Sequence, residues 1–110
     1  MPNLKIFVDE TIFPDCRTAL ARELESIRSM LCRELGVEVA ACQFAVLPVM
    51  ALPDQPGVNV EMQIMPKPDR TRERLVGLAE TLRDAVGYAT HAPVAVRIST
   101  LDPSGYVALK

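Results

Sequence analysis

The chain repeats one pattern twice, with a period of about 55 of its 110 residues. In each copy, a stretch of alternating hydrophobic residues precedes a longer stretch with hydrophobic residues every three or four positions, and a second expected strand follows. Alternation is typical of a half-buried strand, and the three-to-four spacing is typical of an amphipathic helix. The sequence therefore predicts two β-α-β units, over residues 2–48 and 57–101.

The expected strands cover residues 3–8, 39–47, 58–65 and 93–99. The first helix should begin at Pro14, because proline suits the first helical turn, and should end at Gly36. Asp69 is the expected cap of the second helix. We therefore expect one domain over residues 1–110 with an α+β fold, in which two helices cover one face of a four-stranded mixed sheet.

Composition narrows the classes of function. Hydrophobic residues make up 49% of the chain, more than a small domain easily buries, which favours an oligomer. A net charge of −2 without a basic stripe argues against a nucleic-acid partner. No apolar run approaches the roughly 20 residues that a membrane span needs.

The three cysteines, Cys16, Cys32 and Cys42, lack metal-ligand spacing, and the chain has a single histidine. We therefore expect no metal site, and we expect the cysteines to be free thiols in a reducing cytoplasm.

Pro2 follows the initiator methionine directly. Removal of Met1 would leave a secondary amine at the start of the first expected strand, where a missing N–H is tolerated. Burial and nearby cations would lower the pKa of such an amine toward neutrality, where a general base is most efficient. Many proteins begin with Met-Pro, so Pro2 indicates catalysis only together with the rest of the pattern.

An amino-terminal proline followed by two β-α-β units resembles the tautomerase superfamily, above all its 5-(carboxymethyl)-2-hydroxymuconate isomerase and macrophage migration inhibitory factor branches. Residues 67–71 (KPDRT) stand where the isomerase branch has a basic residue and a Gly-Arg-Ser element, and residues 106–110 resemble its tail. The resemblance implies a homotrimer, with sheets around a central channel, that needs no cofactor. It also implies a tautomerase that isomerises a small 2-hydroxymuconate-like carboxylate in aromatic degradation, with Pro2 as general base.

The resemblance also points to residues that would bind the substrate carboxylate and the developing enolate. Gln43 stands where 4-oxalocrotonate tautomerase has a substrate-binding arginine in its second strand, and Arg97 takes the corresponding place in the second unit. Lys67 and Arg70 flank the start of the second helix, where anions are favoured. The alternatives are an interface salt bridge for Arg97 and solvated charges for Lys67 and Arg70.

Three further residues are candidates for the walls of the pocket. Met65 at the end of the third strand and Tyr106 in the tail would line it, and Ser99 would donate a hydrogen bond. Met65 and Tyr106 are equally explained by simple packing.

Other functions stay open on the sequence alone. The missing arginine at Gln43 fits a catalytically inactive tautomerase-fold trimer that serves as a binding or structural protein. A different two-unit β-α-β domain, such as a ferredoxin-like binding module, would instead be a monomer.

Overall fold

The computed structural model describes residues 2–110. In chain order the elements are β1 (Asn3–Asp9), α1 (Phe13–Leu35), the short 3-10 helix η1 (Val39–Ala41), β2 (Gln43–Val49), β3 (Val58–Ile64), α2 (Arg72–Thr90) and β4 (Val94–Thr100). The two predicted β-α-β units are therefore β1-α1-β2 and β3-α2-β4.

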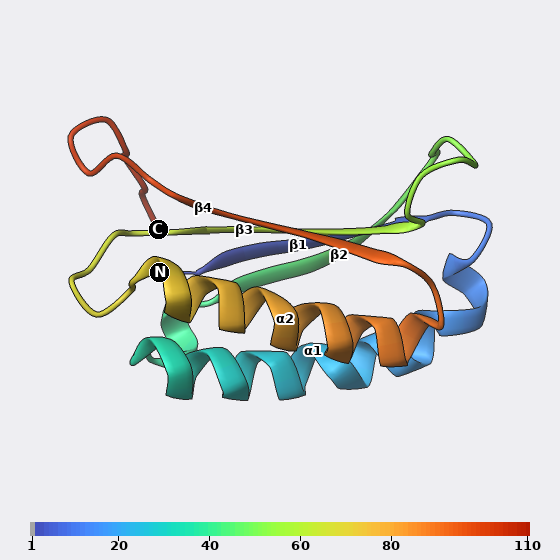
Figure 1. Ribbon diagram of the computed structural model, residues 1–110, viewed down its shortest axis with the longest axis horizontal. Coiled ribbons are helices and arrows are strands. Elements are labelled where there is room, and N and C mark those ends of the chain that lie inside the picture. Colours follow the sequence, from blue (N-terminus) through green and yellow to red (C-terminus); the bar gives the residue numbers. More distant parts are fainter. Residues whose placement is uncertain (1) are drawn as a thin grey trace.

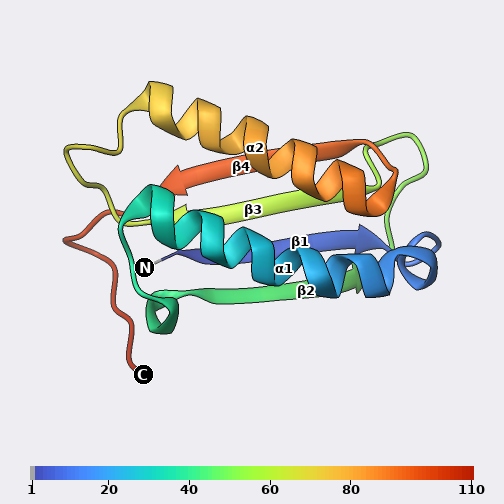
Figure 2. The same ribbon diagram turned by 90° about the horizontal axis from the view of Figure 1, so that it is seen from below.

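The four strands form one mixed sheet in the order β2-β1-β3-β4. Within each unit the strands are parallel, because a helix returns the chain to the starting end, while β1 and β3 meet antiparallel at the centre. Both helices lie on the same face of the sheet, and the opposite face is bare (Figures 1 and 2). The expected α+β architecture is confirmed.

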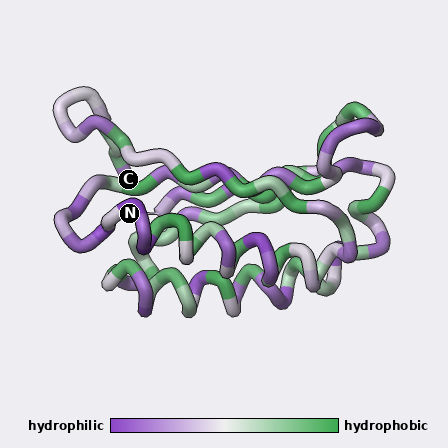
Figure 3. The backbone as a smooth tube through the Cα atoms, viewed as in Figure 1, coloured by the Kyte–Doolittle hydropathy of each residue, from purple (hydrophilic) through white to green (hydrophobic). Residues whose placement is uncertain are grey.

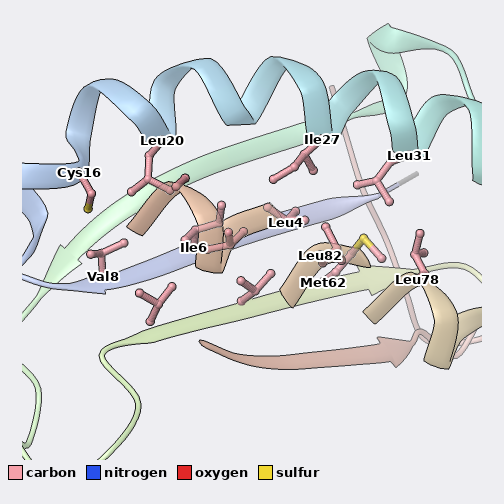
Figure 4. Close-up of a cluster of buried hydrophobic side chains, with 14 of the residues drawn as sticks. Leu4, Ile6, Val8, Cys16, Leu20, Ile27, Leu31, Met62, Leu78 and Leu82 are labelled. Carbon is pink, nitrogen blue, oxygen red and sulfur yellow. The ribbon is translucent and has the colours of Figure 1, made fainter. Parts of the chain in front are cut away.

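The strand residues that face the helices form the core. Alternating side chains of the two central strands, such as Leu4, Ile6 and Val60, are completely buried, and this alternation of hydropathy is visible along the strands (Figure 3). They pack against one hydrophobic stripe on each helix, which includes Ile27 of α1 and Leu82 of α2 (Figure 4). Burying a side chain of this size stabilises the fold by about 1.5–3 kcal/mol.

The ends of α1 agree with prediction, but the start of α2 does not. Pro14 lies in the first turn of α1, and Gly36 ends it in a left-handed conformation (φ 64°). Thr71, rather than Asp69, is the N-cap of α2: it has extended backbone angles, and its side-chain oxygen accepts a hydrogen bond from the N–H of Arg74 at 3.3 Å. Asp69 lies too early, since residues 67–70 form a turn closed by the N–H of Arg70 on the oxygen of Lys67.

The second strand is also shorter than predicted. Residues 39–41 form η1 instead of extending β2. The register explains this, because Gln43 is paired with Asn3, the first residue of β1. Residues 39–41 therefore lie beyond the paired part of β1. Among residues 2–110, no helix combines the length and the apolar character required to cross a membrane.

Candidate functional site

Most of the predicted site residues gather at one end of the sheet, where β1 and β2 begin and β3 and β4 end. We call this the Pro2 end. Pro2 is buried directly before β1, and its carbonyl oxygen accepts a hydrogen bond from the N–H of Gln43 at 3.0 Å. Continuing the register of β1 and β3 by one residue brings Ile64 to the other side of Pro2. Pro2 thus begins a central strand that has neighbours on both sides.

A row of uncharged polar side chains crosses the bare face of the sheet beside Pro2. The register aligns Gln43, Asn3, Gln63 and Ser99, one from each strand. Their side chains share the face opposite the helices, because their positions alternate with those of the buried residues. Gln43 and Ser99 are exposed, so their amide and hydroxyl groups are accessible.

Arg97 lies two residue pairs farther from the Pro2 end, in a row with Lys5 and Glu61. Its guanidinium donates a hydrogen bond to the side-chain oxygen of Asn59, and the Asn59 amide donates to Glu61 Oε2 at 2.8 Å. The ion pairs within residues 2–110 join Arg74 to Glu34 and Arg83 to Asp84. Arg97 is therefore held by an amide in the described part of the chain, and its remaining N–H groups are available for a further acceptor.

The chain's own Arg97 is distant from its Pro2. The register separates them by two strand spacings and three residues along a strand, or roughly 14 Å between their backbones. An arginine side chain does not span this distance. Within a single chain, the structure therefore brings Gln43 close to Pro2 and leaves Arg97 apart from it.

Arg70 has a role that the sequence analysis did not predict. Only 8% of it is exposed, and its guanidinium donates to the carbonyl oxygen of Met65 at 2.6 Å and to that of Leu35 at 3.2 Å. Leu35 is the last residue of α1, where helix carbonyls lack partners and the helix dipole favours a cation. Arg74 makes the same kind of contact with the carbonyl oxygen of Glu34, at 2.7 Å. Arg70 from the turn before α2 and Arg74 from its first turn thus cap the end of α1.

The other candidates lie in the connections at the Pro2 end. Lys67 is exposed in the loop after β3, and Met65 is half-buried at the start of that loop. Tyr106 directly follows the turn over residues 103–105. Its N–H closes this turn by donating to the carbonyl oxygen of Asp102 at 3.0 Å. Hydrogen bonds from the hydroxyl and N–H of Ser104 lower the pKa of the Asp102 carboxyl and hold the turn.

A groove of about 820 Å³ runs between β4 and α2. It brings Arg70 and Ser99 together with Arg72 and Thr100. Apolar side chains, among them Val96 and Ile98, also line it. Within residues 2–110, no group of three or more His, Cys, Asp or Glu side chains is arranged to hold a metal ion.

Solved structures share this fold over nearly the whole chain. The macrophage migration inhibitory factor-like protein of Entamoeba histolytica superposes with a TM-score of 0.70 at 9% identity, over 97% of this chain and 94% of that chain. The protein Pt0534, inactivated by 2-oxo-3-pentynoate, gives 0.75 at 17% identity, over 96% and 90%. A fused 4-OT wild-type symmetric trimer gives 0.68 at 16% identity, over 96% and 90%.

No protein-family model matches the chain. No curated protein sequence matches it either. At identities this low the structural likeness establishes the fold, so the activity has to be argued from this chain's own residues.

Proposed function

We propose that this chain, which has the fold of the tautomerase superfamily, is a cofactor-independent keto–enol tautomerase of a small 2-hydroxymuconate-like carboxylate, with Pro2 as its general base. The position of Pro2 carries the proposal. It is buried at the start of a central strand, where removal of Met1 would place a secondary amine. Burial disfavours the charged form of an amine, which favours the neutral form that a general base requires.

In the proposed reaction, the Pro2 nitrogen accepts the proton of the enol hydroxyl and returns a proton to a carbon of the conjugated chain. An O–H bond breaks and a C–H bond forms, while the enol C–O becomes a C=O and the conjugated chain loses one C=C. The 2-hydroxydienoate thus becomes its 2-oxo isomer with no change in composition or charge. A cation at the carboxylate and a donor at the enolate oxygen would stabilise the transition state.

Gln43 and Lys67 are proposed as binding groups at the Pro2 end. The backbone of Gln43 is already bonded to Pro2, so its exposed side-chain amide begins beside the proposed base and can donate to a substrate oxygen. Lys67 is an exposed cation in the loop that follows β3. Met65, half-buried in the same loop, is proposed as a wall of the pocket.

Arg97, Ser99 and Tyr106 are proposed to complete a pocket on a neighbouring copy, because the register places Arg97 far from its own Pro2. Arg70 is proposed as a positioning residue, since its guanidinium holds the loop that carries Lys67.

A homotrimer is proposed because Arg97 can complete a pocket on a neighbouring copy only in an oligomer. The connection between β2 and β3 and the turn after β4 rise past the bare face at opposite ends of the sheet (Figure 1). Met50 in that connection is 88% exposed, and Leu109 in the tail beyond the turn is 94% exposed, so both apolar side chains are largely uncovered among residues 2–110. Neighbouring copies would bury them. Light scattering should give three times the chain mass of 12.1 kDa, and a monomer would contradict the trimer.

The reaction is tested by following conversion of the enol forms of 2-hydroxymuconate and phenylenolpyruvate. Pro2→Ala should lower kcat/KM by about 100-fold or more, the usual contribution of a general base. Pro53→Ala, which changes an exposed proline in the connection after β2, is the matched control and should retain the activity of the unchanged protein. Equal rates for Pro2→Ala and the unchanged protein would refute the role of Pro2. From the class of substrate, we further propose that the protein acts in the cytoplasm, in aromatic degradation.

A further inference from the structure

We propose that Cys32 and Cys42 form a reversible intramolecular disulfide, which would act as a redox-sensitive link between the end of α1 and the start of β2. Their Sγ atoms are 3.7 Å apart, and both side chains are half-buried. Cys16, in contrast, is buried near the opposite end of α1, where its thiol donates to the carbonyl oxygen of Ile12. This inference is independent of the proposed enzymatic function.

The backbone holds the two sulfurs in proximity. Cys32 lies in the last turns of α1, and its carbonyl oxygen accepts hydrogen bonds from the N–H groups of Gly36 and Val37. Cys42 directly follows η1, and its N–H donates to the oxygen of Val39 at 3.0 Å. Since a disulfide is about 2.05 Å long, the sulfurs must approach by only about 1.7 Å. The contact is thus produced by the hydrogen-bonded end of α1 and by η1.

Cys42 is the thiol that a reagent in solution would reach. It lines an open groove of about 250 Å³ together with Arg28 and Gln43, and Cys32 is not among the lining residues. Burial, followed by the hydrogen bond with Cys32, raises the pKa of the Cys42 thiol, and the positive charge of Arg28 opposes this. Exchange at Cys42 is therefore slow at neutral pH and accelerates as the pH rises.

The reaction needs a small-molecule disulfide as oxidant. The Cys42 thiolate attacks one of its sulfurs, whose S–S bond breaks, and a mixed disulfide forms as one thiolate leaves. The Cys32 thiolate then attacks the Cys42 sulfur and releases the second thiolate. Two electrons and two protons pass from the cysteine pair to the reagent. Because Gln43 follows Cys42 and is bonded to Pro2, the link would be closed directly beside the Pro2 end.

The test is to incubate the folded protein with oxidised glutathione and to count thiols after denaturation. The unchanged protein should fall from three free thiols to one, with a mass loss of about 2 Da, and non-reducing peptide mapping should join Cys32 to Cys42. Cys16→Ser should fall from two thiols to none. Cys32→Ser should instead retain a glutathione adduct on Cys42. Dithiothreitol should restore all thiols, and the rate of oxidation should rise with pH.

Retention of three thiols by the folded protein would overturn the proposal, as would a disulfide that includes Cys16 or joins two chains. The unchanged protein and Cys16→Ser suffice for this decision. It therefore does not depend on whether Cys32→Ser folds, and Cys32→Ala offers a second form of that variant.

Discussion

Replacing Arg70 with methionine tests the capping contact between the start of α2 and the end of α1. Methionine keeps most of the buried apolar stem but removes the guanidinium and its hydrogen bonds to Met65 and Leu35. A hydrogen bond to a charged group contributes about 1.5–3 kcal/mol. The hydrogen bond to Leu35 is long at 3.2 Å, and Nε of Arg70 is buried without a partner. Both features reduce the net stabilisation, so the two hydrogen bonds together contribute less than twice the middle of this range. We expect Arg70→Met to reduce the free energy of unfolding by about 2–4 kcal/mol.

Urea unfolding followed by circular dichroism measures this change. With a slope of about 2 kcal/mol per molar urea, the middle of the usual range, the midpoint should fall by about 1–2 M. Arg72→Met is the matched control, because Arg72 is an exposed arginine two residues later. It should change the free energy of unfolding by less than about 0.5 kcal/mol.

A loss below about 0.5 kcal/mol in Arg70→Met would refute the capping role. If such a variant also showed a higher KM for a carboxylate substrate with its stability intact, Arg70 would be a direct anion binder, as the resemblance to the tautomerase family implies. The measurement therefore separates a positioning residue from a binding residue.

Two further predictions concern the helices. Thr71→Ala removes the N-cap of α2 and should cost about 1 kcal/mol in urea unfolding, whereas Asp69→Ala should cost clearly less; equal losses would contradict the assignment of the cap. Burial raises the pKa of the Cys16 thiol, so its contribution to stability is complete below the ordinary thiol pKa and is lost as the pH rises through the raised value. The unchanged protein should therefore lose stability relative to Cys16→Ala between neutral and alkaline pH, and a difference that does not vary with pH would refute this.

The strands and helices were predictable because their signals are local. The alternation around Leu4 and Ile6 and the spacing around Leu82 reflect which side of each element is buried, and each pattern lies within a few neighbouring residues. The left-handed end of α1 at Gly36 was predictable for the same reason. The order β2-β1-β3-β4 follows from pairing between distant segments, and the local patterns did not predict it.

The missed features depend on contacts between distant parts of the chain. Arg70 looks like one more charge at a helix start, and its role follows from a carbonyl oxygen 35 residues earlier. Arg97 lies beside Asn59 only because β3 and β4 pair in this register. The proximity of Cys32 and Cys42 depends on the turn and η1 between them. No motif in the sequence indicates any of these three contacts.

The central claim is that the Pro2 nitrogen is a base, and the unmutated sequence offers the most direct test. The chain is prepared in two forms, with Met1 removed and with Met1 retained, each verified by intact mass. Retention makes the Pro2 nitrogen an amide, which cannot accept a proton, and leaves every other side chain in place. We expect ketonisation of phenylenolpyruvate to be fast with the first form and at least about 100-fold slower with the second. Equal rates for the two forms would contradict the claim.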